Sequence, residues 1–169
     1  EGWRLATLSR CPAHPHGGCG FCRHGTYARK TPPGTEIARW YCRTAGRTFS
    51  LLPDHLAVRL PGTLSEIEQV VVTVEQARSV EAAAEGLRSL DISLPSVVRW
   101  VRRRLDPVRR LLPIVVGLLP QLLRGCAPTL TALRARLACD QVLVWLRALT
   151  EVHLQTLVPP LGFKPPPYA

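Results

Sequence analysis

Apolar residues recur at helical spacing after residue 60, whereas the first 60 residues are irregular and glycine-rich. The helical spacing predicts a first helix from Ser65 to about Ala77, with Ser65 and Glu68 forming a capping box. Ser79 is expected to cap a second, short helix over residues 80–87. The first helix would bury Ile67, Val70, Val71 and Val74.

A third helix is predicted to begin after Ser93 and to tolerate Pro95 in its first turn. We expect it to end near Leu105, because Asp106-Pro107 follows. Its apolar face would bury Val97, Trp100, Val101 and Leu105, while Arg99, Arg102, Arg103 and Arg104 lie on the other side.

Two Leu-rich segments follow. Residues 111–123 predict a helix broken by Pro113 and Pro120, and residues 130–157 predict one long amphipathic helix. The long helix would turn Leu133, Leu137, Val144 and Leu149 inward. This apolar surface either packs on the rest of the chain or forms a homodimer interface. From residue 159 the proline-rich sequence favours an extended tail.

Before residue 60, two short strands at 26–29 and 36–43 are predicted on either side of a turn at 31–34. The expected fold is therefore mainly α, with a small β module like a zinc ribbon at the N-terminus, a helix-turn-helix and a C-terminal helical hairpin. The expected segments are 1–60 (ribbon), 61–110 (helix-turn-helix), 111–158 (packing or dimerisation) and 159–169 (tail).

The charge balance points to a polyanionic partner. The chain has 22 basic and 12 acidic residues, a net charge of +10, and every basic residue except Lys30 and Lys164 is arginine. Arginine holds phosphates and guanine edges with a planar fork. A GC-rich genome also favours arginine, but it does not account for the surplus of positive charge.

Several classes of protein do not fit the sequence. The first ten residues lack the apolar region of a secretory signal, and the chain does not begin with Met, as in a fragment. The apolar run at 111–123 is too short for a membrane span, which needs ~20 residues. The late acids Asp106, Asp140 and Glu151 form no catalytic set. We therefore expect a non-enzymatic protein of the bacterial cytoplasm, nucleoid-associated, with no membrane partner and no small-molecule substrate.

Four of the six cysteines crowd into residues 11–42, which favours a metal site over disulfides. Cys19 and Cys22 have the spacing of a tetrahedral zinc knuckle, and Cys11 and His14 repeat it with mixed ligands. Cys42 is followed three residues later by Ala45, where a second thiolate knuckle would have cysteine. The alternative is that these cysteines are small buried hydrophobic residues.

The segment Trp40-Tyr41-Cys42-Arg43-Thr44-Ala45-Gly46-Arg47-Thr48-Phe49-Ser50 is similar to the "R-Y-x-C-x-x-C-G-x-T-F-S" segment of zinc ribbons in bacterial transposases. Residues 11–105 resemble a family of transposon-associated bacterial proteins in which such a ribbon precedes a helix-turn-helix. The resemblance implies zinc ligands at Cys11, Cys19, Cys42 and the position of Ala45. Because Ala45 cannot bind metal, either Cys22 or a histidine (His14 or His16) supplies the fourth ligand, or the fold survives without metal.

Residues 79–87 and 92–100 resemble the "A-A-x-x-L … V-S-x-x-T-V-x-R-W" pattern of transposase-type helix-turn-helix domains. The resemblance implies a third helix that enters the major groove of double-stranded DNA. Ser96 and Arg99 would then reach base edges. The phosphate contacts would come from Arg102, Arg103, Arg104, Arg109 and Arg110.

These observations lead to one functional expectation and one alternative. The first is a DNA-binding protein similar to the recognition region of a transposase, which serves as an accessory or remnant of a mobile element or as a regulator. The alternative is a protein-interaction module that uses the apolar surface of residues 111–157 and does not bind DNA.

Overall fold

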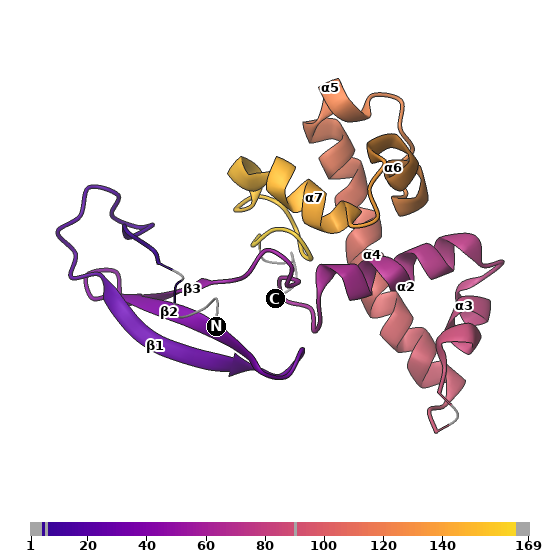
Figure 1. The fold of residues 1–169 in the computed structure, drawn as a ribbon, viewed down its shortest axis with the longest axis horizontal. Helices are drawn as coiled ribbons and strands as arrows, with labels where there is room; N and C mark the ends of the chain where they lie inside the picture. The colour runs from indigo at the N-terminus through magenta and orange to yellow at the C-terminus, as the bar shows by residue number, and fades with distance from the viewer. Residues whose placement is uncertain (1–4, 6, 90, 165–169) are drawn as a thin grey trace. The chain divides into compact units, whose positions relative to one another are not determined.

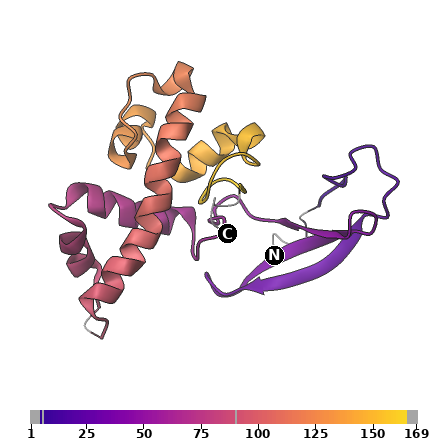
Figure 2. The same ribbon diagram turned by 180° about the vertical axis from the view of Figure 1, so that it is seen from behind.

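The computed structural model describes residue 5 and residues 7–89 and 91–164. The chain divides into two compact units, residues 1–53 and residues 54–169 (Figures 1 and 2). The first, the N-terminal unit, contains a three-stranded antiparallel sheet. The second, the helical unit, contains helices α2 to α7. Each unit has its own packed core.

The sheet of the N-terminal unit has the strand order β1-β2-β3. The strands are β1 (Cys22–Arg29), β2 (Thr35–Cys42) and β3 (Arg47–Leu51). The first two confirm the predicted strand pair around residues 31–34, although β1 begins four residues earlier than residue 26. The third strand was not predicted from the sequence.

The register of the sheet decides which residues share a face. Tyr41 lies opposite Cys22 on β1 and opposite Thr48 on β3. Because successive residues of a strand point to opposite faces, Cys42 lies on the other side of the sheet from Tyr41. We call the side of Cys42 the cysteine face and the side of Tyr41 the tyrosine face.

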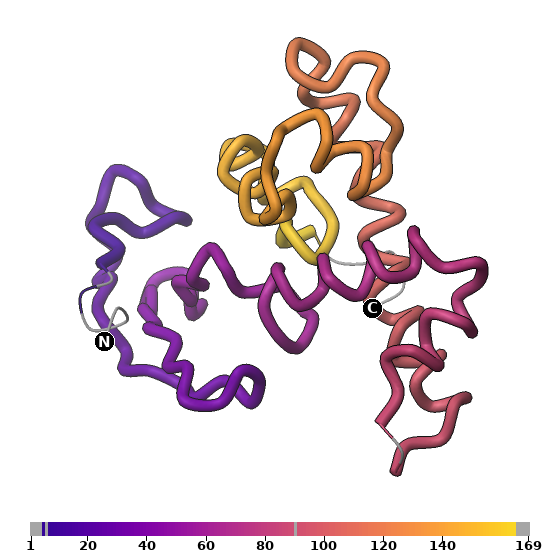
Figure 3. The backbone as a smooth tube through the Cα atoms, turned by 45° about the vertical axis from the view of Figure 1, so that its right-hand side comes forward, coloured from indigo at the N-terminus to yellow at the C-terminus, as the bar shows by residue number. Residues whose placement is uncertain are grey.

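The helical unit begins with α2 (Leu64–Gln76), α3 (Val80–Leu87) and α4 (Leu94–Leu118). It continues with α5 (Pro120–Leu123), α6 (Leu130–Leu137), α7 (Val142–Leu149) and a 3-10 turn over Glu151–His153. Helix α4 runs the length of the unit, with α3 packed along its first part and α5 following its end (Figure 3). Helix α2 contacts α4, α6 and α7 and so joins the two halves of the core.

The N-cap of α2 lies two residues before the predicted cap at Ser65. Thr63 is the N-cap: Glu66 N donates to Thr63 Oγ1 at 3.1 Å, and Thr63 N donates to Glu66 Oε2 at 2.6 Å. The predicted capping box of Ser65 and Glu68 is wrong, because the Glu68 side chain is turned into the core. The predicted cap at Ser79 is confirmed, since its hydroxyl accepts from Ala82 N at 3.0 Å.

Helix α4 is longer than predicted. It does not end near Leu105 but continues through Pro107 and Pro113 to Leu118. Its buried stripe runs without a break through Val97, Val101, Leu105, Val108, Leu111, Leu112 and Val115. The helical spacing of these residues keeps one face on the core, and this packing offsets the backbone hydrogen bonds that the two prolines cannot donate. The expected boundary between residues 110 and 111 therefore lies inside a helix.

The predicted single helix over 130–157 is wrong. Helix α6 ends at Leu137, and its C-cap Ala138 adopts the left-handed conformation with φ 49° and ψ 42°; α7 starts after Gln141. Of the four residues expected inward, Leu133 is fully buried, Leu137 and Val144 are half-buried, and Leu149 is exposed. The C-terminal hairpin expected from residues 111–123 and 130–157 is therefore wrong: residues 111–118 belong to α4, and the second segment is divided into α6 and α7, which contact each other.

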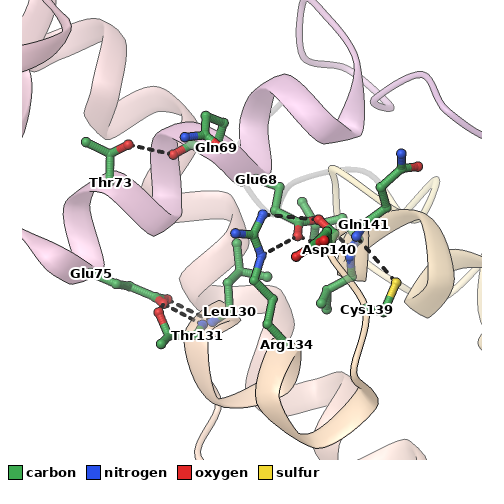
Figure 4. A network of polar contacts seen from close by, with 12 residues as sticks. Glu68, Gln69, Thr73, Glu75, Leu130, Thr131, Arg134, Cys139, Asp140 and Gln141 are labelled. Atoms are coloured by element: carbon green, nitrogen blue, oxygen red, sulfur yellow. Dashed lines mark hydrogen bonds and ion pairs between the residues drawn. The ribbon is translucent and has the colours of Figure 1, made fainter.

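Two glutamates of α2 hold the starts of α6 and α7 (Figure 4). The Glu75 carboxylate accepts from Leu130 N at 2.9 Å and from Thr131 N at 2.8 Å. The buried Glu68 carboxylate accepts from Val142 N at 3.1 Å, from Leu143 N at 2.9 Å and from Arg134 Nε at 2.9 Å. Because the first amides of a helix have no partner within the helix, these carboxylates satisfy donors that would otherwise be unpaired.

Residues 54–60 belong to the helical unit and not to the N-terminal unit, so the first boundary falls at Pro53 and not at residue 60. Buried Arg147 donates from Nη1 to Leu56 O at 2.7 Å, and Val58 N donates to Pro160 O at 2.9 Å.

The start of the expected extended tail is packed on the helical unit. Leu161 is fully buried, and a Cβ on Gly162 would collide with Leu157. Residues 165–169 lie outside the described residues.

Within the described residues, no helix combines the length and the apolar character that a bilayer crossing requires.

Candidate metal centre

Four side chains of the N-terminal unit converge on one point. They are Cys11, His14, Cys19 and Cys42, and their ligand atoms all lie within 4.8 Å of one another. The three cysteines are buried and the histidine is half-buried. None of the six cysteines of the chain forms a disulfide. Three thiols and an imidazole at this separation could hold a metal ion.

The loop before β1 forms the first half of the site. His14 N donates to Cys11 O at 3.1 Å, and Gly17 N donates to His14 O at 3.0 Å, so two turns follow each other directly. The first turn brings the imidazole back over the thiol, with Cys11 Sγ and His14 Nδ1 at 3.6 Å. The turn from Cys11 to His14 thus brings both ligand atoms together in the manner of a zinc knuckle, as their spacing in the sequence indicated.

The second half joins Cys19 to the β2–β3 turn. Cys42 Sγ lies 3.4 Å from His14 Nδ1 and accepts a hydrogen bond from Ala45 N at 3.3 Å. The Thr44 hydroxyl donates to Cys19 O at 3.2 Å and fixes the two segments to each other. Ala45 therefore contributes its backbone amide to the sulfur of Cys42, and such partners orient metal ligands. Thr44 was missed from the sequence, because the pairing of its turn with Cys19 leaves no local signal.

The sequence left the fourth ligand open between Cys22, His14 and His16, and the cluster contains His14. Cys22 is not part of it: this residue lies opposite Tyr41 on the tyrosine face, with an exposed side chain, whereas Cys42 points to the cysteine face. His16 is exposed and also lies outside the cluster. His24 is a strand residue of β1, as expected, and its ring lies 5.5 Å from that of Tyr41.

Crowding of the thiols shifts their pKa values in opposite directions. Burial raises the pKa of Cys11, but hydrogen bonds with His14, the Ala13 backbone, Cys42 and Cys19 outweigh it and bring the pKa down to about 7. Burial, together with hydrogen bonds and repulsion from Cys11 and Cys42, raises the pKa of Cys19 to about 11. One thiol of the cluster is thus easily ionised, and another keeps its proton until a cation replaces it.

Two distances within the cluster are close to those of a tetrahedral site. With metal–sulfur bonds of ~2.3 Å and metal–nitrogen bonds of ~2.0 Å, neighbouring ligand atoms should lie ~3.5–3.8 Å apart. The two contacts of His14 Nδ1, at 3.6 Å and 3.4 Å, are close to that range. The arrangement is compatible with a zinc site. It is closed by Phe21, Ala45 and Phe49, which pack against the cysteines.

The residues expected to contact DNA all lie on α4, but not all are equally exposed. The exposed ones are Arg99, Arg102, Arg103, Arg109 and Arg110. Ser96 is half-buried, and its hydroxyl lies 3.4 Å from Arg99 Nη2. Arg102 Nη2 donates to Glu81 Oε1 of α3 at 3.0 Å, so this arginine is shared between an ion pair and solvent.

Trp100 and Arg104 depart from the expectation. Trp100 is 40% exposed and is not the buried anchor that the sequence suggested. The Arg104 guanidinium stacks on its ring, 3.9 Å from the centroid, and donates to Trp100 O at 3.3 Å. Burial lowers the pKa of Arg104. Arg104 therefore turns toward the flank of α4 and away from the other arginines.

Comparison of the chain with protein-family models, with curated proteins and with solved structures gave no match.

Proposed function

We propose that this chain is a non-enzymatic protein that binds double-stranded DNA with helix α4. The observation that carries the proposal is the row of exposed arginines on one face of α4, directly opposite the buried stripe. The resemblance of residues 11–105 to transposon-associated proteins favours a role as an accessory or remnant of a mobile element, or as a regulator.

The geometry of the helix gathers the arginines. At ~100° per residue, positions 99, 102, 103, 109 and 110 fall within about a third of the circumference of α4. Asp106 lies among them and is the only acid between residues 94 and 118. A helix with one basic face suits the major groove, where phosphates line both sides and base edges form the floor.

The packing of α3 supports a helix-turn-helix arrangement. Ala83 and Ala84 are buried, and α3 packs against α4. Small side chains allow this close approach, which leaves the opposite face of α4 open. Ser96 and Arg99 then lie in the first turns of α4, where a recognition helix reads base edges.

We assign zinc to the metal centre. Three thiolates and one imidazole are a ligand set that zinc prefers, and four protein ligands leave no open position for catalysis. The ion would be structural: it would join the loop of Cys11 and His14 to the sheet through Cys19 and Cys42.

Duplex binding at low salt, measured by fluorescence anisotropy, tests the proposal. Arg103→Ala should weaken binding to all duplexes alike, whereas Arg99→Ala should reduce discrimination between sequences by ~1–3 kcal/mol if Arg99 contacts a guanine. Arg124→Ala is the matched control, because Arg124 is exposed and lies beyond α4, and the substitution removes the same charge as Arg103→Ala. Failure of the wild-type protein to bind any duplex would refute the proposal.

A second candidate function rests on a different surface. Trp145, Leu149 and Val152 are 52%, 36% and 86% exposed and follow one another at helical spacing on α7 and the turn after it. Such an apolar stripe suits a protein partner. Binding through it would depend weakly on salt, whereas binding to DNA loses affinity steeply as salt rises.

A further inference from the structure

The tyrosine face of the sheet carries aromatic and basic side chains that neither the metal centre nor α4 uses. Tyr27 lies opposite Ile37, and Arg39 and Tyr41 follow Ile37 on the same face of β2. Tyr27 is 39% exposed, and Arg39 and Tyr41 are half-buried. The face thus carries the Tyr27 and Tyr41 rings and the Arg39 guanidinium over two neighbouring strands, while Ile37 on the same face is fully buried.

The side chains of this face are already arranged by stacking. The Arg39 guanidinium lies over the Tyr27 ring, 5.7 Å from its centroid. The His24 and Tyr41 rings lie 5.5 Å apart with an interplanar angle of 39°. Arg39 Nε is buried and has no hydrogen-bond partner among the described residues, so any contact with a phosphate would come from the terminal nitrogens of the guanidinium. Hydroxyl side chains of β3, Thr48 and Ser50, continue the face beside Tyr41 and Arg39.

The positive charge of the N-terminal unit favours a polyanionic ligand. Within residues 7–53 the basic residues are Arg10, Arg23, Arg29, Lys30, Arg39, Arg43 and Arg47, and Glu36 is the only acid. A positively charged surface with exposed rings is the combination that binds unpaired nucleotides, because the rings stack on bases and the arginines attract the phosphates. A duplex cannot use the rings in this way, since its base faces are hidden in the stack.

We infer that the tyrosine face binds single-stranded nucleic acid, with bases stacked on Tyr27 and Tyr41 and a phosphate held by Arg39. This site lies in the N-terminal unit, is separate from the arginines of α4 and does not depend on the proposed duplex binding. A protein with both surfaces could contact a duplex and an unpaired strand.

Anisotropy of a fluorescein-labelled oligothymidylate of ~15 nucleotides, titrated with the zinc-loaded full chain, tests the inference. Tyr27→Ala should weaken binding about fivefold or more, whereas Tyr27→Phe, which keeps the ring, should stay within about twofold of wild type. Arg39→Ala should also weaken binding. Arg47→Ala removes a charge from the cysteine face, where Arg47 lies opposite Cys42, and should have the smaller effect. An oligouridylate of equal length tells whether RNA is bound as well as DNA.

A duplex probe separates this inference from the proposed function. Tyr27→Ala should leave duplex affinity within about twofold of wild type. Arg103→Ala should weaken duplex binding, and adding Tyr27→Ala to it should weaken oligothymidylate binding by the same factor as in the wild-type background. Oligothymidylate binding that is equally strong in wild type and Tyr27→Ala, or absent at low salt, would overturn the inference. Loss of duplex binding alone would overturn only the assignment of α4.

Discussion

Cys22 and His14 are rival ligands in the sequence, and the pairing register of the sheet separates them. Cys22 has the better spacing to Cys19, but it pairs with Tyr41 and so points away from Cys42. The register depends on a bulge between Arg23 and Thr26, where Gly25 has a φ of 79°, and a glycine alone does not fix the pairing on either side of a bulge. The sequence could therefore predict Cys11, Cys19 and Cys42 as ligands, but it could not decide the fourth.

Cobalt binding followed by absorption should distinguish the two residues. Cys22→Ser should bind one cobalt ion per chain with an unchanged thiolate-to-metal band, because its sulfur lies on the other face of the sheet. Cys42→Ser should lose a thiolate and bind the ion far more weakly, and His14→Ala should weaken it while keeping the full thiolate band. A reduced thiolate band in Cys22→Ser would show that Cys22 is a ligand after all.

Metal affinity should fall as the pH falls. Cys19, with a pKa raised to about 11, must lose its proton to bind, and Cys11, with a pKa of about 7, becomes protonated as the pH drops below neutrality. Both protons compete with the ion, so acid favours the metal-free form. Zinc titrations between about pH 8 and pH 6 should show this loss, with release of about one proton or more near pH 7. An affinity independent of pH would mean that the thiols are already ionised.

The bounds of a helix were predicted well where the apolar spacing and a capping residue agree. They were not predicted where the sequence holds no signal for the end of the helix. The second helix was found because Ser79 caps it. The end of α6 was missed because Ala138 adopts a left-handed conformation that usually requires glycine. The extent of α4 was missed because Pro107 looked like an end, although the buried stripe of the helix continues past it.

The contact of Glu68 with α6 and α7 gives a prediction for stability. Glu68→Ala would leave Val142 N, Leu143 N and Arg134 Nε without their carboxylate partner. We expect a loss of ~2–4 kcal/mol in the free energy of unfolding, measured by urea denaturation. Glu85→Ala breaks only an exposed pair with Arg88 and should cost ~1 kcal/mol or less. Similar losses for the two variants would mean that the buried carboxylate does not hold these helices.

At the scale of the whole molecule, the division into a cysteine-rich module and a helical part was foreseen from composition, but its boundary was not. Residues 54–60 carry no apolar periodicity, and their place in the helical unit depends on Arg147 and Pro160, about 100 residues away in sequence. Long-range contacts of this kind leave no mark in a local pattern.

The two units should respond differently to loss of metal. The small sheet depends on the metal centre for much of its core, since Cys11, Cys19 and Cys42 are its buried cluster. The helical unit has a separate core that includes Leu105, Leu111 and Leu143. In the full chain, a zinc chelator should raise amide hydrogen exchange in β1–β3 and leave α4 protected. Equal loss of protection in α4 would contradict the structural independence of the two cores.

The salt dependence of duplex binding tests the central claim, binding of DNA by α4, most directly. Each phosphate contact removed should lower the slope of log affinity against log salt by ~0.9. The double variant Arg103→Ala with Arg110→Ala should therefore reduce the slope by about 2, while Arg124→Ala leaves it unchanged. Equal slopes for wild type and the double variant would show that these two exposed arginines of α4 do not contact DNA.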